Sequence, residues 1–336
     1  MQPAGATGSK ELRKLTEQEI ARLFSPKILE RGIEYFEEGR LQRLFVYKSN
    51  IMAECQGTQP ENYHISLDVR DGNIVASCTC PYAFGYCKHI AAVLYGWVVR
   101  PSAFRDLGKS EETLSGLEKG QIVEIVMDMI RYDPDVTYVI NLRLTPAEEL
   151  PEFVRKETGS IFSEEYVDYL NVREIVKKLD IFREYSSDLS REKKIDTSLA
   201  VLEPVIDAIV GNYTRLDDAD GLMANFFGAA MDLFGSLLPT IKDVGKQRIL
   251  LTRALDWYMD AEWGLESEVL QFLSDYPAQL GQDRYMIDAV ELKIADFRRS
   301  FISTSPKYSE EHEYLDERIR RLNMLKSALR KNSPAK

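Results

Sequence analysis

The residues best suited to chemistry are concentrated in one short stretch, "SCTCPYAFGYCKH" at residues 77–89. It holds three of the four cysteines and one of the three histidines of the chain. Cys78, Cys80, Cys87 and His89 follow the spacing C-x-C, six residues, C-x-H. Three thiolates and one imidazole suit a tetrahedral Zn²⁺, and four protein ligands leave no open position to activate a water molecule. The motif therefore predicts one structural zinc ion.

Two other interpretations of this stretch stay open at the level of sequence. The four side chains can be buried thiols and a core histidine, or Cys87 and His89 can form a catalytic dyad. The dyad leaves two cysteines without a role and places its members close together at one helix start. A zinc site accounts for more of the residues. Cys55 stands apart on a predicted strand, where we expect it to pack as a small apolar side chain.

Helices and strands that can position the four ligands are predicted on both sides of them. A helix begins at Ser25-Pro26, since proline at the first helical position loses no hydrogen bond. Four strands follow, and Asp71-Gly72 between the last two is a strong hairpin signal. The first two ligands end the fourth strand on one side, because side chains two apart share a face. The other two begin the helix "KHIAAVLYGWVV".

Strand signals disappear after Pro101, and amphipathic helical patterns replace them. The predicted fold class is α+β: a small zinc-finger unit with a four-stranded antiparallel meander, followed by a larger all-α domain. The expected organisation is a flexible leader at 1–15, a zinc-finger domain at 16–100 and a helical domain at 101–336. The linker is expected near 101–110. The helices are expected to stack as antiparallel pairs, as they do in solenoids.

The ligand motif and its flanks resemble the SWIM zinc finger family. The C-x-C…C-x-H pattern lies between a β-hairpin and the apolar helix "HIAAVLYGW", and "ILERGIEYFEEGRL" resembles the segment that precedes such fingers. The resemblance covers about residues 16–100 and matches all four ligand positions. SWIM fingers occur in chromatin-remodelling ATPases, transposase-like proteins, plant regulators and partners of recombination factors. The resemblance thus implies binding to DNA or protein by a finger fused to a helical module.

The charge of the chain is distributed unevenly. The net charge is −11, of which residues 1–100 carry +1 and the remainder −12. An acidic surface repels nucleic acid, so we expect any DNA contact within residues 16–100. The candidate contacts are the basic residues near the finger and the aromatic residues of the metal loop, which can stack on bases: Arg40, Arg43, Lys48, Arg70, Lys88, Arg100, Tyr82, Phe84 and Tyr86. Scattered solvated charge is an equally open interpretation of these basic residues.

Two functions follow from the sequence, and a third is retained as a lesser alternative. The first is a protein-interaction adaptor, and the second is a DNA-binding factor without sequence preference; either can serve DNA repair, recombination or transcription. An enzyme is not expected, because Gly108-Lys109-Ser110 lacks the rest of a phosphate-binding loop and "LDDADG" at 216–221 fails as a calcium loop. The lesser alternative is an unrecognised enzymatic site in the helical domain. Without a signal peptide or an apolar run long enough to span a bilayer, we expect a cytoplasmic protein.

Overall fold

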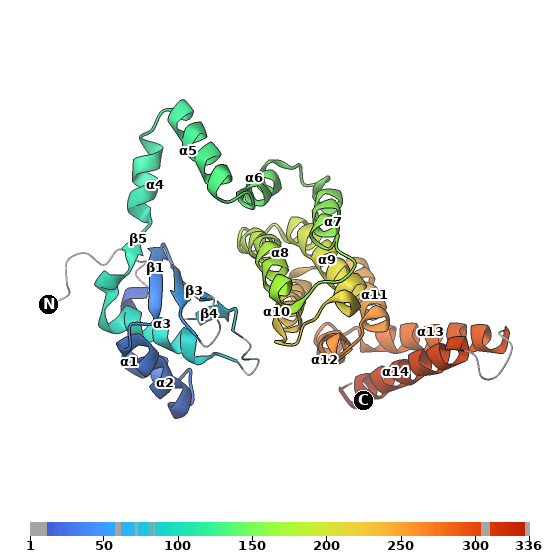
Figure 1. The fold of residues 1–336 in the computed structure, drawn as a ribbon. Helices are drawn as coiled ribbons and strands as arrows, with labels where there is room; N and C mark the ends of the chain where they lie inside the picture. Colours follow the sequence, from blue (N-terminus) through green and yellow to red (C-terminus); the bar gives the residue numbers. More distant parts are fainter. Residues whose placement is uncertain are drawn as a thin grey trace. The chain divides into compact units, whose positions relative to one another are not determined.

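The computed structural model describes residues 12–57, 62–70, 73–80, 82, 85–303 and 310–332. The chain divides into two compact units, Met1–Tyr132 and Asp133–Lys336 (Figure 1). The first contains a sheet and the second is helical, as the predicted α+β class requires. The turn predicted at Asp71-Gly72 lies outside the described residues.

The first unit is built around a small sheet. Its helical elements are η1 (Leu12–Lys14), α1 (Glu17–Ala21), α2 (Pro26–Glu37), α3 (Lys88–Val99), η2 (Pro101–Ala103), α4 (Gly108–Ser115) and α5 (Lys119–Tyr132). Its strands are β1 (Leu41–Tyr47), β2 (Asn50–Cys55), β3 (Tyr63–Arg70), β4 (Asn73–Cys78) and β5 (Arg105–Asp106). The sheet order is β4-β3-β2-β1-β5, in which the first four strands form the antiparallel meander and β5 runs parallel to β1.

One face of this sheet packs against α3. Along β3 the side chains of Tyr63, Ile65 and Leu67 are buried and alternate with more exposed residues, because successive side chains point to opposite faces. Helix α2 lies directly against α3 at Gly32, where an added Cβ would come within 2.5 Å of the Ala91 Cβ. The glycine therefore permits the close approach that places the C-terminal half of α2 beside the predicted metal site.

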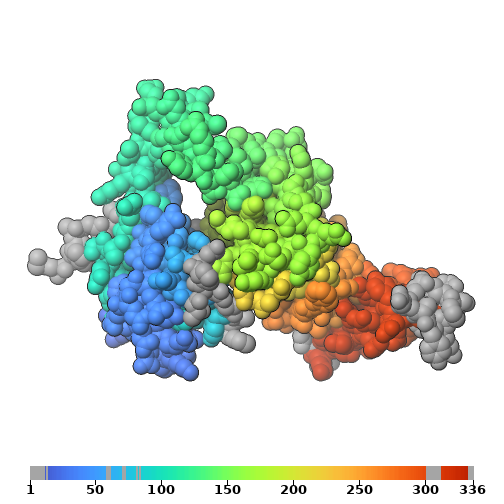
Figure 2. All heavy atoms as spheres, viewed as in Figure 1, coloured from blue at the N-terminus to red at the C-terminus, as the bar shows by residue number. Residues whose placement is uncertain are grey.

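Two predicted boundaries differ from the structure. Residues 12–14 are not part of a loose leader: they form η1, Leu12 is buried, and its carbonyl accepts a 2.8 Å hydrogen bond from Trp97 Nε1. The region 101–110 is not a linker, because β5 pairs with β1 and the Leu107 amide donates to the Val46 carbonyl at 2.9 Å. The first unit consequently extends through α4 and α5, and Figure 2 shows α5 side chains at the surface.

The second unit is a stack of packed helices: α6 (Val136–Leu144), α7 (Leu150–Ile161), α8 (Tyr169–Arg191), α9 (Ile195–Asn212), α10 (Leu222–Leu237), α11 (Val244–Asp260), α12 (Leu265–Gln279), α13 (Asp283–Ser303) and α14 (Glu310–Asn332). Short 3₁₀ turns η3 (Tyr213–Arg215) and η4 (Leu238–Thr240) follow α9 and α10. Helix α8 packs on α9, α11 on α12, and α13 on α14 (Figure 1). Nine of the sixteen residues of α10 are buried against neighbouring helices, and their apolar side chains belong to the continuous apolar core of this unit.

Helix α10 corrects one expectation from the sequence. The segment Leu222–Thr240 is long and apolar enough to cross a membrane by length and composition, although no such run was expected. Its large side chains, among them Met223, Phe227 and Phe234, are buried against other helices of the unit. A mostly buried helix in a globular core passes the same test of length and composition. The cytoplasmic localisation stays a prediction.

Candidate metal centre

The four predicted ligands come from the end of β4 and the start of α3. Cys78 is the last residue of β4, and Thr79 continues the pairing with β3 through two bonds: its amide donates to the His64 carbonyl at 3.1 Å, and its hydroxyl accepts from the His64 amide at 2.9 Å. The extended backbone brings Cys80 to the same side as Cys78. Cys87 is the N-cap of α3, and His89 lies in its first turn.

The donor atoms of this group converge on one point. All four donor atoms lie within 4.8 Å of one another: the Sγ atoms of Cys78, Cys80 and Cys87, and Nδ1 of His89. The distances from His89 Nδ1 to Cys78 Sγ and to Cys87 Sγ are both 3.7 Å. Tetrahedral Zn²⁺ with Zn–S near 2.3 Å and Zn–N near 2.0 Å separates sulfur from nitrogen by about 3.5 Å. The cysteines are free thiols, and three of these four ligand residues are buried. The residues fit one zinc ion.

Protons and a metal ion compete for the three sulfurs. The pKa of Cys80 is held well below its usual range because its sulfur accepts hydrogen bonds from the Cys78 and Cys87 thiols. The pKa of Cys78 is raised, first by side-chain hydrogen bonding with Cys80 and Cys87 and then by burial. Without a cation the cluster thus favours one thiolate over three. Zinc supplies the charge that makes all three thiolates stable, and its binding releases protons.

Aromatic rings enclose the histidine ligand. The ring centroid of His89 lies 4.7 Å from that of Tyr63 and 5.4 Å from that of Tyr35. With Nδ1 directed at the sulfurs, Nε2 is buried and makes no hydrogen bond within the described part of the chain. Zinc-binding histidines usually donate this second N–H to a carboxylate or carbonyl. Here the two tyrosine rings fix the orientation of the imidazole by packing.

Two cations lie next to the ligand shell. Lys88 Nζ lies 4.3 Å from the centroid of the Tyr35 ring and donates a 2.6 Å hydrogen bond to its hydroxyl, and Arg40 Cζ lies 4.4 Å from the same centroid. Three thiolates around one divalent ion leave one excess negative charge. These cations and the N-terminus of α3 offset it. Tyr35 was not among the residues selected from the sequence; its only signal was its place in "GIEYF" ahead of the finger.

Cys55 lies near this cluster without joining it. It is fully buried at the end of β2, opposite Tyr63. Burial raises the pKa of its thiol to about 11, although Arg40 and Lys88 lower it in part. A protonated thiol in this position packs as an apolar side chain, as the sequence predicted.

This unit is a small zinc-binding module in which the ion joins a sheet edge to a helix. The family model of the SWIM zinc finger matches residues 63–95, which include all four ligands. The chain therefore contains a SWIM zinc finger, placed to hold one zinc ion. A protein of Methanocaldococcus jannaschii described as uncharacterized is 23% identical over 191 residues, which are 54% of this chain and 80% of that protein. No solved structure shows significant similarity to the chain.

The predicted DNA contacts are for the most part already engaged with neighbouring side chains. Arg40 pairs with Glu38 at 2.5 Å and Arg43 with Glu54 at 3.1 Å. Lys48 Nζ is 3.9 Å from a carboxylate oxygen of Glu111, which belongs to α4.

Most of the other residues predicted to contact DNA are also held by neighbouring groups or lie outside the described residues. Lys88 is held by Tyr35, and Arg100 lies over the Phe36 ring at 5.4 Å. The Arg70 side chain and Phe84 lie outside the described residues. Tyr82 is 41% exposed. Tyr86 is half-buried because its hydroxyl donates to the Ile74 carbonyl and its ring packs near Phe24.

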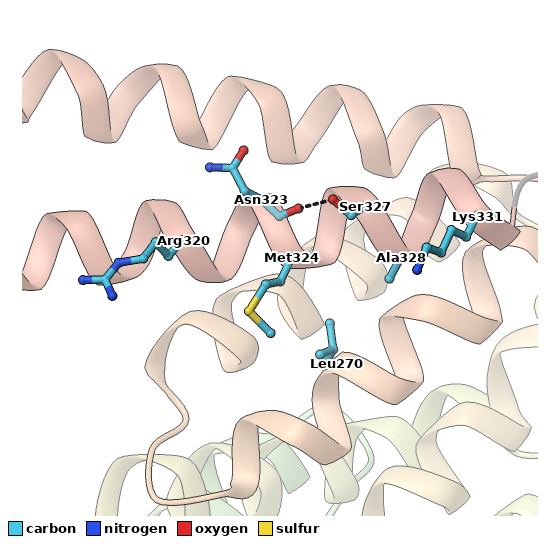
Figure 3. Close-up of a pocket in the computed structure, with 7 residues that line it drawn as sticks. All are labelled: Leu270, Arg320, Asn323, Met324, Ser327, Ala328 and Lys331. Carbon is cyan, nitrogen blue, oxygen red and sulfur yellow. Dashed lines mark hydrogen bonds between the residues drawn. The ribbon is translucent and has the colours of Figure 1, made fainter.

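A groove in the second unit is the place to look for the enzymatic site that the sequence left as a lesser alternative. It lies between α12 and α14, has a volume of about 670 Å³ and is open to solvent (Figure 3). Its lining residues are Leu270, Arg320, Asn323, Met324, Ser327, Ala328 and Lys331. The hydroxyl of Ser327 donates to the backbone carbonyl of Asn323 at 2.9 Å, one turn earlier. The lining holds no histidine or carboxylate that would activate this hydroxyl.

Proposed function

We propose that the chain is a non-catalytic adaptor whose zinc finger binds another protein. The observation that carries the proposal is the pairing of the finger's cations. Glu38, Glu54 and Glu111 neutralise three of the six basic residues that a DNA contact would use. Binding to a phosphate backbone depends on several free cations acting together, and the paired arrangement offers few.

The surface beside the metal loop supports a protein partner. Strand β4 is an edge of the sheet, so its outer backbone groups have no strand beside them among the described residues of this unit. Val75 on this strand is 71% exposed. An exposed edge with an apolar side chain is the kind of surface to which an extended segment of another protein adds as a further strand.

The absence of catalysis is also a proposal, and two features support it. Four protein ligands saturate the zinc ion, so that it stabilises the fold and has no position for a substrate. The groove of the second unit is largely apolar with basic residues at its rim, and its lining contains no carboxylate, histidine or cysteine.

The proposal is tested by capture from native extract with the zinc-loaded full chain as bait, with and without nuclease. We expect a defined protein to be retained after nuclease and at high salt. Val75→Lys should abolish that retention, whereas Ile249→Lys, at a similarly exposed site in α11, should not. Zinc content and circular dichroism of both variants establish that each is folded.

The alternative function gives the opposite pattern. If the finger is a DNA-binding module, fluorescence anisotropy with single- and double-stranded DNA shows binding at low salt that falls steeply as salt rises. Tyr82→Ala then weakens binding, because base stacking on an exposed aromatic contributes about 1–3 kcal/mol. Salt-sensitive DNA binding without a nuclease-resistant protein partner would refute the adaptor proposal.

A further inference from the structure

Helix α5 of the first unit exposes an unusual amount of apolar surface. More than half of its residues are apolar, yet none is buried. The most exposed are Ile122 at 37%, Val123 at 51%, Ile125 at 38%, Met127 at 46%, Met129 at 49% and Tyr132 at 91%. Nothing within the described first unit covers this helix.

The apolar residues occupy one continuous side of α5. Its polar side carries Glu124, Asp128 and Arg131, the last two joined by a 2.5 Å ion pair. At 3.6 residues per turn the apolar residues span roughly 220° of the circumference. A surface helix of a globular protein usually has an apolar stripe about half as wide. An apolar side this wide is typical of a helix that packs against a partner.

The exposed area matches what a stable interface needs. If a fully exposed large apolar side chain presents roughly 200 Å², the exposed fractions of the six residues amount to about 600 Å². This is at the upper limit of the largest apolar patch on a typical monomer, roughly 300–600 Å². A stable interface buries about 800 Å² per partner, of which roughly 60% is apolar. The apolar side of α5 carries about this much exposed area in total, and a pair of helices buries the part of it nearest the seam.

The charges of α5 favour a second copy of the same helix over a charged partner. Lys119 and Arg131 balance Glu124 and Asp128, so the helix has no net charge that would select an oppositely charged surface. Lys119 makes no ion pair within the described part of the chain. Asp133 follows the C-terminal end of the helix, and the residues 119, 122, 126, 129 and 133 alternate spacings of three and four. Residues 119, 122, 126 and 129 thus form a short seam of the kind seen in two-stranded coiled coils, with Lys119 at its start. Asp133 lies one residue beyond the end of the helix, where its carboxylate also accepts a 3.1 Å hydrogen bond from the Asp135 amide.

We propose that α5 pairs in antiparallel orientation with α5 of a second copy of this chain. This orientation places Lys119 of each copy at the end where Asp133 of the other lies, and it brings Gly120 toward the exposed Tyr132 of the other copy. A parallel pair would place like charges together. The interface is isologous, so one set of contacts is made twice. The inference concerns self-association and does not depend on what the zinc finger binds.

The test is the mass of the zinc-loaded full chain in solution, measured by light scattering and by sedimentation over a range of concentrations. We expect a dimer. Ile122→Glu combined with Met129→Glu places two carboxylates in the seam and should convert it to a monomer. Gln121→Glu combined with Arg131→Gln makes the same change in net charge on the polar side and should leave the dimer intact. Unchanged zinc content and helicity show that these exposed substitutions keep the fold.

A charge exchange tests the orientation. Lys119→Glu alone and Asp133→Lys alone should each weaken the dimer about tenfold, since two exposed ion pairs are lost per dimer. The double variant K119E/D133K restores the pairs and should restore the dissociation constant. A monomeric wild-type chain at every concentration, a dimer that survives the seam variant, or a double exchange that fails to recover would each overturn the proposal.

Discussion

The two units of this molecule reach stability by different means. In the second unit the apolar core runs through α8 to α12, with side chains such as Phe182, Phe227 and Leu255 fully enclosed by neighbouring helices. The core of the first unit is much smaller, and two of its members, Cys80 and Cys87, are also metal ligands. The metal site of the first unit is therefore part of its core.

This difference shows how a small sheet can be held against a helix. A domain with a small core retains little stability after the entropy of folding is subtracted, and a structural metal is one of the usual supplements. The ion joins β4 to α3, the same two elements whose apolar faces form the core. The second unit has enough buried apolar surface to need no such link. The contrast can be tested by removing one source of stability at a time.

The largest effect is expected from removing zinc. Chelation, or Cys80→Ser, should unfold the first unit and leave the second folded, because structural zinc contributes on the order of 10 kcal/mol to the folding of small metal domains. Hydrogen exchange should then show loss of protection in β3 and α3 but not in α9. Cys55→Ala is the matched control: it removes a buried thiol outside the ligand set and should retain zinc at a cost of about 1 kcal/mol. Full protection of α3 without zinc would contradict the comparison.

The converse change acts on the second unit. Phe227 in α10 is fully buried, and Phe227→Ala should lower the free energy of unfolding of this unit by about 3–5 kcal/mol, since it removes apolar contacts and leaves a cavity. Denaturant unfolding followed by hydrogen exchange in α9 and α11 measures the loss. Zinc stoichiometry should not change. A variant that loses zinc together with helical protection would show that the two units do not fold separately.

The same contrast explains which features were predictable from sequence. The ligand set, the meander and α3 are encoded locally, in C-x-C spacing, in the alternation of Tyr63, Ile65 and Leu67 and in one apolar run. Strand β5 was missed because its two residues, Arg105–Asp106, carry no periodic signal and are a strand only through pairing with β1. The carboxylate partners of the finger's cations were missed for a related reason. Lys48 and Glu111 are 63 positions apart, and only the fold brings them together.

A smaller effect is expected at the start of α10. The Asp218 carboxylate accepts hydrogen bonds from the Met223 and Ala224 amides at 3.0 and 2.9 Å, and from the Tyr213 hydroxyl at 3.1 Å. These bonds satisfy amides that otherwise have no partner at a helix N-terminus. Asp218→Ala should cost the second unit about 1–2 kcal/mol. Asp217→Ala is the neighbouring control and should have little effect on the thermal midpoint; equal losses in both variants would argue against the capping role.

The smallest effect concerns pH, where the two units should respond in opposite directions. Acid protonates the zinc-binding thiolates, so the first unit loses its ion as pH falls. In α9 of the second unit, burial raises the pKa of Glu203, and the nearby Asp207 adds to this. The folded state then binds this proton more tightly than the unfolded state. The stabilising contribution of that proton is complete below the unfolded pKa and is lost as pH rises through the folded pKa.

Glu203→Gln removes the free-energy cost of ionising this buried carboxyl group. The variant should match the wild type near pH 4 and exceed it at pH 7 by at most about 1 kcal/mol, because a shift of one pKa unit is worth about 1.4 kcal/mol and the site is partly solvated. Urea unfolding of the second unit at several pH values measures the difference. Glu164→Gln removes an exposed carboxylate and serves as the control. The opposite result would be a variant that loses stability relative to the wild type between pH 4 and pH 7. It would mean that the attraction of the ionised Glu203 carboxylate to Arg253 and Lys246 outweighs the cost of burying its charge.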